Sequence, residues 1–196
     1  VNRPDVLQRK GLYAPPKGAS KIIGLEVSGK IQKIGKKVKN LKINQKVCAL
    51  VHGGGYAEFC KVFYKHVLPI PKGMNFIEAA AIPENFFTVW YNLFERGKVK
   101  KSDTILIHGG SSGIGTAAIH LCKVHGCKVI TTVGNKKKQL YCKKLGADLA
   151  IDYNKSNFLE VITKYTKNKG VDIILDMVGQ KYFEKNILLL RDKGKL

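Results

Sequence analysis

The chain has 196 residues, of which 35 are Lys or Arg and 14 are Asp or Glu, so its formal net charge is +21. With 44% hydrophobic and 25% charged residues, it has the composition of a globular protein with one domain or two small ones. A disordered chain, a collagen-like repeat and a disulfide scaffold are therefore excluded. No stretch approaches the roughly 18 consecutive apolar residues of a membrane helix, so we expect no membrane partner.

The positive charge is carried almost entirely by lysine. Lys makes up 31 of the 35 basic residues and is scattered from Lys10 to Lys195. A nucleic-acid-binding surface is usually a clustered stripe that is enriched in Arg or interleaved with aromatic residues. We therefore expect solvated lysines and no specific nucleic-acid partner, with nonspecific binding of polyanions at low salt left open.

The five cysteines predict free thiols. Their number is odd and no C-x-x-C occurs, which argues against a disulfide framework. Cys122 and Cys127 lie on or just after one predicted helix, which suits buried thiols better than a metal site. We expect a reducing, cytoplasmic environment. The cysteines are Cys48, Cys60, Cys122, Cys127 and Cys142.

Residues 1–75 are predicted to form a small, irregular β-barrel. Short apolar runs are separated here by Gly and Pro, and His52–Gly55 is expected to be a tight turn. Each Pro biases the residue before it toward an extended conformation. The expected extended segments are Lys21–Gly35, Lys46–Val51, Tyr56–Val62 and Val67–Gly73.

The pattern changes at Asn75. Residues 76–95 have the spacing of a connecting helical segment, interrupted at Pro83. In residues 96–196, apolar strands alternate with amphipathic helices, which predicts right-handed βαβ units and a parallel sheet covered on both faces. The fold class is therefore α/β, a β-barrel followed by a doubly wound parallel sheet. The expected strands are Thr104–His108, Lys128–Val133, Leu149–Asp152 and Val171–Asp176; the expected helices are Gly113–His125, Lys136–Leu145, Ser156–Asn168 and Gln180–Leu190.

Both ends of the chain lead us to expect a fragment. The chain starts at Val1 without Met, so a targeting segment cannot be read from it. A doubly wound nucleotide-binding sheet has about six strands, and four are recognised here. Arg191–Leu196 is expected to be a turn plus the first residue of another strand.

A glycine-rich loop predicts a dinucleotide site. Gly110, Gly113 and Gly115 form a G-x-x-G-x-G pattern that follows one predicted strand and opens a predicted helix. Glycines permit a sharp turn and a close approach of the backbone to a pyrophosphate, and the helix N-terminus offers N–H groups and a positive dipole end. Placed between strand and helix, the motif is a specific signal; the alternative is a structural turn.

The end of the next predicted strand favours NADPH over NADH. NAD-selective sites place Asp or Glu there to bind the ribose 2′-hydroxyl. This chain instead has Asn135 followed by Lys136, Lys137 and Lys138. Cations at a helix start oppose the helix dipole, and a 2′-phosphate would compensate them. The alternative is one more solvated lysine run.

Short-chain dehydrogenases have a similar glycine loop but are disfavoured. In that family the loop lies near the N-terminus, and a catalytic Tyr-x-x-x-Lys follows far downstream. Here a long β-rich segment precedes the loop. Tyr165 and Lys169 have the required spacing but follow the loop too closely, on an amphipathic helix, and Tyr13 and Lys17 precede it.

Eight segments carry a resemblance to a known family: Val1–Asp5, Gln8–Tyr13, Pro15–Ser20, Gly24–Gly29, Gly53–Glu58, Ala79–Glu84, Ser111–Ile119 and Asp176–Gly179. They resemble the medium-chain dehydrogenase/reductase superfamily and, within it, the zinc-free quinone oxidoreductases of the zeta-crystallin-like branch, including the p53-inducible type. The resemblance implies a GroES-like catalytic domain over residues 1–75 that lacks its N-terminus. It also implies a Rossmann nucleotide-binding domain over residues 96–196 that lacks its C-terminal strands.

No metal is expected. Zinc-dependent members of the superfamily carry Gly-His-Glu where this chain has Gly24, Leu25 and Glu26, and Leu cannot ligate a metal. The closely spaced cysteines of a structural zinc site are also missing. The histidines have no ligand spacing and are expected to be surface or packing residues: His52, His66, His108, His120 and His125.

The resemblance also implies roles for individual residues. Asn2 and Tyr13 are expected near the substrate carbonyl oxygen, where either could polarise it and Tyr13 could pass on a proton; the alternatives are an Asn that closes a strand end and a Tyr that fills a rim. Asp5, Glu26 and Asp176 could be functional or structural. The expected cofactor contacts are Thr88 and Pro83–Asn85 beside the nicotinamide, Gly109, Gly110, Gly113, Ile114 and Gly115 at the pyrophosphate, Asn135 and Lys138 at the 2′-phosphate, and Tyr153 on the adenosine side.

The function that these expectations imply is an NADPH-dependent, zinc-independent reductase of quinones or other conjugated carbonyls, forming a homodimer. Two alternatives stay open. One is an enal or enoyl-thioester reductase on the same scaffold. The other is a non-catalytic NADPH-binding protein with a crystallin-like or RNA-binding role.

Overall fold

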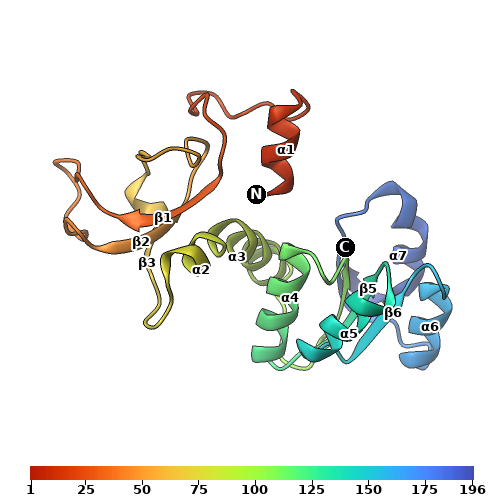
Figure 1. Cartoon of the computed structure of the whole chain (residues 1–196). Coiled ribbons are helices and arrows are strands. Elements are labelled where there is room, and N and C mark those ends of the chain that lie inside the picture. Colours follow the sequence, from red (N-terminus) through yellow and green to blue (C-terminus); the bar gives the residue numbers. More distant parts are fainter. The chain divides into compact units, whose positions relative to one another are not determined.

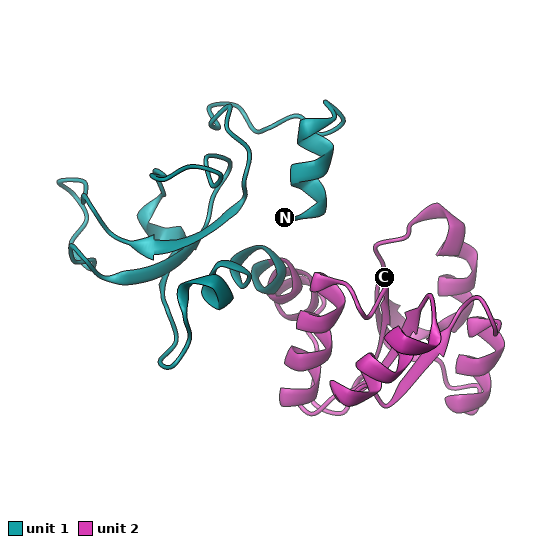
Figure 2. Ribbon diagram, in the orientation of Figure 1, with its two compact units in different colours: residues 1–87 teal, residues 88–196 magenta.

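The computed structural model describes residues 1–196, which divide into two compact units. Figure 2 colours them separately as Val1–Phe87 and Thr88–Leu196. The division falls inside one helix, α3. No helix combines the length and the apolarity that crossing a bilayer requires.

The first unit is built on a three-stranded antiparallel sheet with the order β1-β2-β3 (Figure 1). Its strands are β1 (Glu26–Lys30), β2 (Lys46–Leu50) and β3 (Val67–Pro69); its helices are α1 (Arg3–Arg9), the 3₁₀ turn η1 (Tyr64–His66), α2 (Phe76–Ala80) and the first part of α3 (Pro83–Val89). Cys48 and Ala49 on the central strand are buried, as the apolar run around them predicts.

The first unit contains one helix that the sequence pattern does not predict and lacks one strand that it does. Residues 3–9 form a helix, which is capped by Asn2, and the Asp5 side chain accepts the Asn2 N–H at 2.7 Å. The segment Tyr56–Val62 is irregular rather than a strand. Its alternating pattern does not correspond to alternating burial, since residues 56–59 are all exposed.

The second unit is a five-stranded parallel sheet with the order β6-β5-β4-β7-β8. Helices α4 and α5 cover one face, and α6 and α7 the other, as right-handed crossovers require (Figure 1). The bounds are η2 (Trp90–Arg96, π-helical), β4 (Thr104–His108), α4 (Gly113–Val124), β5 (Lys128–Val133), α5 (Lys136–Lys144), β6 (Leu149–Asp152), α6 (Phe158–Tyr165), β7 (Val171–Leu175), η3 (Gln180–Tyr182), α7 (Phe183–Leu189) and β8 (Leu190–Lys195).

The core of this unit follows the two-sided burial of its strands. One cluster lies under α6 and α7 and contains Leu106, Ile130, Ile151, Phe158, Ile162, Val171, Ile174 and Leu189. Alternate strand residues such as Ile105, Ile107 and Val129 are completely buried on the other side. The four predicted strands are confirmed to within a residue, because each is a short apolar run buried on both faces.

The interruption expected at Pro83 is confirmed, since α2 ends at Ala80 and α3 begins at Pro83, the position where its missing N–H costs nothing. One further expectation is wrong. The end of the chain is a fifth strand, β8, paired in parallel with β7, rather than a turn and one strand residue. The irregular register between β7 and β8 and the positive φ of Lys193 hide this strand from a period-two pattern.

The five cysteines are free, and all except Cys60 are buried. The predicted burial of Cys122 and Cys127 is confirmed, at 0% and 2% exposure. Burial is the largest influence on each thiol and raises the pKa of all five, that of Cys122 to about 12.

Candidate functional site

The glycine loop connects β4 to α4, and its glycines are required by close packing. Gly109 has φ +68°, which a side chain rarely adopts. A Cβ on Gly110 would collide with the buried side chain of Thr131, including its Cβ at 2.8 Å. A Cβ on Gly115 would collide with the backbone of Gly109 and, at 2.6 Å, with that of Gly110. The loop can therefore fold back tightly on itself only without side chains.

The start of α4 presents free backbone donors. Ser112 caps this 12-residue helix, its Oγ accepting the Gly115 N–H at 3.0 Å. The N–H groups of Gly113 and Ile114 lie in the first turn and have no intrahelical acceptor. The Gly110 N–H donates to the carbonyl of Thr132 at 3.1 Å and so anchors the loop to β5. An anion at this helix end would be bound by Gly113 and Ile114, with support from the helix dipole.

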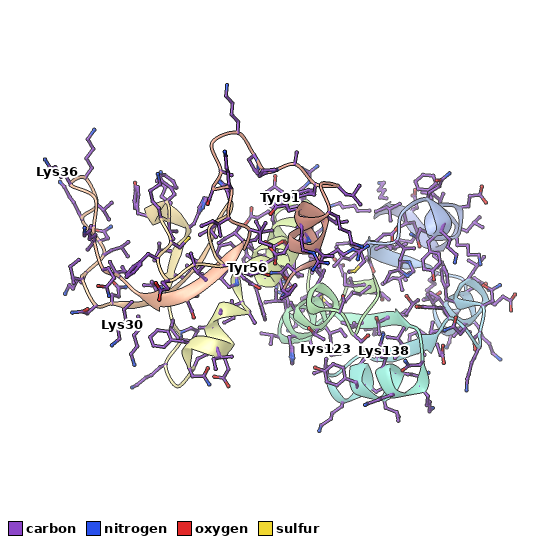
Figure 3. All side chains as sticks on the ribbon, turned by 45° about the horizontal axis from the view of Figure 1, so that its top comes forward. Lys30, Lys36, Tyr56, Tyr91, Lys123 and Lys138 are labelled. Carbon is purple, nitrogen blue, oxygen red and sulfur yellow. The ribbon has the colours of Figure 1, made fainter.

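At the carboxyl end of β5, Asn135 caps α5. Its Oδ1 accepts the Lys138 N–H at 2.9 Å, which leaves the side-chain NH₂ group to donate outward. Lys136, Lys137 and Lys138 are exposed on the first turn of α5, where Figure 3 labels Lys138. The segment from Gly134 to Lys138 contains no acid. The structure thus brings together amide and ammonium donors beyond the strand end.

Tyr153 borders the same strand end from β6. Its hydroxyl oxygen is 2.7 Å from where a Cβ on Gly134 would lie, and its backbone N–H donates to the carbonyl of Val133 at 3.0 Å. The side chain of Asn154 donates to the Gly134 carbonyl at 2.7 Å. Tyr153 is 43% exposed, so part of its side chain is accessible to a ligand.

The first unit contains a hydrogen-bonded cluster around Asn2. The Asn2 amide nitrogen donates to Glu26 Oε1 at 2.8 Å, and the Glu84 N–H donates to Glu26 Oε2 at 2.9 Å. The Tyr56 hydroxyl, labelled in Figure 3, donates to Asp5 Oδ2 at 2.9 Å. Glu26 therefore joins the predicted catalytic Asn2 to the start of α3. Sequence reasoning named Asp5 and Glu26 without a role and missed Tyr56, which lies 51 residues from its partner.

The cluster is acidic and partly desolvated. Asp5 is 2% exposed, and its second oxygen, Oδ1, has no hydrogen-bond partner. Burial, followed by the charges of Glu26 and Asp5, raises the pKa of Glu84. Burial and the bond to Asp5 raise the pKa of Tyr56. Because the other side chains of the cluster are acidic, an electron-rich oxygen would be bound here by neutral donors such as the side-chain amide of Asn2.

An open cavity of about 1700 Å³ adjoins the cluster. Asn2, Asp5, Glu26 and Tyr56 line it together with apolar side chains of the sheet. No group of three or more His, Cys, Asp and Glu side chains is arranged to hold a metal ion.

Two family models match this chain, one for each unit. "Alcohol dehydrogenase GroES-like domain" matches residues 1–72 and "Zinc-binding dehydrogenase" matches residues 113–196. The chain belongs to the medium-chain dehydrogenase/reductase superfamily. The order of the two matches is the order of the two units.

The relatives of this superfamily member include reductases of several kinds. The chain is 33% identical over its whole length to the "Synaptic vesicle membrane protein VAT-1 homolog" of Danio rerio and covers 40% of that protein. It is 29% identical to the "Quinone oxidoreductase" of Mus musculus and covers 60% of that protein. Among solved structures, the Escherichia coli quinone oxidoreductase complexed with NADPH has a TM-score of 0.88 at 29% identity, over 99% of this chain and 60% of that one. The CurK enoyl reductase has a TM-score of 0.89 at 29% identity with the same coverage. The chain thus spans about half of the length of these relatives.

Two predicted site residues lie outside the clusters described above. Tyr13 is 47% exposed on the bend that follows α1 and is not among the residues that line the cavity beside Asn2. Thr88 lies on α3, where its carbonyl accepts the side-chain N–H of Asn92 at 2.8 Å and supports the π-helical segment. Their predicted roles stay predictions.

Proposed function

We propose that the whole protein is an NADPH-dependent reductase of quinones or other conjugated carbonyls that transfers hydride without zinc. The observation that carries this proposal is the glycine loop. Gly110 and Gly115 leave no room for side chains, and the α4 N-terminus beyond them offers the donors of Gly113 and Ile114. In this assignment residues 1–75 belong to the catalytic domain, residues 76–95 connect, and residues 96–196 bind the nucleotide.

Cofactor choice is assigned to the β5–α5 turn. A 2′-phosphate beyond β5 would accept hydrogen bonds from the free NH₂ group of Asn135 and from the ammonium group of Lys138. Because no acid occupies the turn, nothing there would bind a ribose 2′-hydroxyl as NAD-selective sites do. Tyr153 would border the adenosine, and Thr88 with Pro83–Asn85 the nicotinamide.

On the substrate side, the proposed role of the chain is to stabilise charge on the carbonyl oxygen. NADPH, when bound, supplies the hydride. The Asn2 amide has two N–H bonds and Glu26 accepts one of them, so the second can donate to the oxygen on which charge develops. The Tyr13 hydroxyl is proposed as a second donor and as the proton source for the product.

A second candidate is an enoyl-thioester reductase. It is favoured by the likeness to the CurK enoyl reductase and by a 35% identity over 189 residues to "Highly-reducing polyketide synthase 1" of Aureobasidium melanogenum, of which the chain covers 8%. Reduction of an enoyl thioester and of an enone requires the same donors at a conjugated carbonyl oxygen, so the scaffold serves either.

The deciding experiment measures oxidation of NADPH and NADH by the full-length protein against a panel of quinones, enals and enoyl thioesters. We expect turnover with NADPH and at least one quinone or enone. We also expect the protein to sediment as a dimer. Preferential turnover of enoyl thioesters would support the second candidate. Tight NADPH binding without any acceptor-dependent oxidation would contradict both and indicate a non-catalytic nucleotide-binding protein.

A further inference from the structure

His108 lies at the carboxyl end of β4, directly before the glycine loop. The strand order reverses direction between β4 and β7, and ligands of open α/β sheets bind outside the carboxyl ends of the strands at such a point. His108 is the last residue of β4 and is fully buried. The glycine loop follows β4, and the Asp176–Gly179 turn follows β7.

Both ring nitrogens of His108 are hydrogen-bonded to buried side chains. Nε2 is 2.8 Å from Oδ1 of Asn186 on α7, and Nδ1 is 2.9 Å from Oγ1 of Thr132 on β5. The Asn186 amide nitrogen donates to Asp176 Oδ2 at 3.1 Å, so its oxygen faces His108 as an acceptor. The neutral ring therefore carries its proton on Nε2, and Nδ1 accepts the proton of the Thr132 hydroxyl.

Each arm of this hydrogen-bonded chain ends at one of the two loops. On one side, the carbonyl of Thr132 accepts the N–H of Gly110 in the glycine loop at 3.1 Å. On the other side, Asp176 Oδ1 accepts the Val178 N–H at 2.7 Å, and Oδ2 accepts the Gly179 N–H at 3.2 Å. The chain therefore links the backbone of the glycine loop to the backbone of the turn after β7.

The two loops also contact each other directly. The Ser112 hydroxyl donates to the sulfur of Met177 at 3.6 Å. The same sulfur is 3.4 Å from where a Cβ on Gly109 would lie. A shift of the Asp176–Gly179 turn would therefore displace the glycine loop directly.

Aromatic packing keeps the His108 ring dry. Its centroid is 5.2 Å from that of Phe158 and 4.9 Å from that of Tyr182, both in edge contacts. Burial lowers the pKa of His108, and the bond to Asn186 and the charge of Asp176 oppose this only in part. The ring is thus kept in the neutral form that the two hydrogen bonds require.

We propose that His108 is a positioning residue for the dinucleotide site, which holds the glycine loop and the Asp176–Gly179 turn together through Thr132 and Asn186. This inference rests on the proposed binding of NADPH. His108 does not itself face the ligand, because its ring is enclosed by protein atoms on all sides. Its contribution is to fix the orientation of the backbone N–H groups in the glycine loop and in the Asp176–Gly179 turn.

The test compares NADPH dissociation constants of the full-length protein and three variants. His108→Gln keeps an N–H donor near the Nε2 position, whereas His108→Leu and Asn186→Leu remove the link. We expect the leucine variants to weaken NADPH binding about 5- to 10-fold, the effect of one lost hydrogen bond, and His108→Gln to recover most of the affinity. Combining the two leucine changes should add little, because both cut the same chain. His120→Gln changes an exposed histidine on α4 and is the control.

Steady-state kinetics separates positioning from general destabilisation. The KM for NADPH should rise in the leucine variants, while kcat at saturating cofactor stays within about twofold. Unchanged affinity in both folded leucine variants would overturn the inference, and so would equal losses in His108→Gln and His108→Leu. If His108→Leu does not fold, Asn186→Leu compared with His108→Gln decides in the same way. Unmutated protein that binds no NADPH would overturn the proposed function and this inference together.

Discussion

Replacing Gly110 by Ala tests whether the glycine loop is built by steric exclusion. The new Cβ would lie 2.8 Å from the Cβ of Thr131 and 2.9 Å from its Cγ2, well inside ordinary van der Waals contact. Thr131 is fully buried and donates to the Ile107 carbonyl at 2.7 Å, so it cannot rotate away without losing that bond. The loop must move instead and break the bond from Gly110 to Thr132.

The expected cost has two parts. Overpacking costs about 1–3 kcal/mol and the lost hydrogen bond about 1 kcal/mol, so the variant should unfold with roughly 2–4 kcal/mol less stability. Moving the donors of α4 should also weaken NADPH at least about tenfold. Chemical denaturation of the cofactor-free protein and fluorescence titration with NADPH measure the two effects.

Thr131→Ala supplies the decisive comparison for Gly110→Ala. It removes two of the three clashing atoms, so the double variant should be more stable than the sum of the single effects predicts, by about 1 kcal/mol or more. Gly35→Ala is the matched control, because its φ is ordinary and its Cβ would meet only Val38 at 3.9 Å. Gly110→Ala with the stability and affinity of Gly35→Ala would refute the steric reasoning.

Four other outcomes follow from the same structure. Lys138→Glu should weaken NADPH binding by about 10- to 150-fold and NADH binding far less, whereas the exposed control Lys169→Glu should change neither; equal losses for both cofactors would make Lys138 an ordinary surface charge. Tyr13→Phe should lower kcat by about 10- to 1,000-fold without changing NADPH affinity, and unchanged turnover would assign Tyr13 to packing. Because the pKa of His108 is lowered in the fold, the unfolded chain binds more protons as pH falls below about 6.5, so stability should drop there by up to about 1.4 kcal/mol per pH unit, a loss that denaturation should not find in His108→Gln. Since Leu25 cannot bind a metal, dialysis against a chelator should leave turnover intact, and recovery of activity by added zinc would contradict this.

The strands of the parallel sheet can be predicted from the sequence because each has a local signal. Strands such as Lys128–Val133 are short apolar runs, and their burial on both faces requires no knowledge of distant residues. The segment Tyr56–Val62 shows the limit of the same reasoning, since a period-two pattern becomes a strand only if a partner lies beside it. Helix α1 is not predicted from the sequence, because its start is marked only by the two-residue cap of Asn2 and Asp5 in a region of short segments broken by Gly and Pro.

The candidate site also has features that the sequence predicts and contacts that it does not. The glycine spacing and the lack of an acid near Asn135 are visible along the chain. The contacts that explain them are not: Thr131 lies 21 residues from Gly110, and His108 meets Asn186 across 78 residues. A histidine without ligand spacing is predicted to be a surface or packing residue, because no local pattern shows which buried partners its two nitrogens will have.

The state of the thiols bears on how this chain tolerates reactive molecules. Conjugated carbonyls and quinones add to thiolates, and the rate of such addition follows the fraction of thiol that is ionised and accessible. Burial raises the pKa of every cysteine here and removes four of them from the surface. Covalent adducts formed by an electrophile should therefore concentrate at Cys60, and the interior of the sheet should be spared.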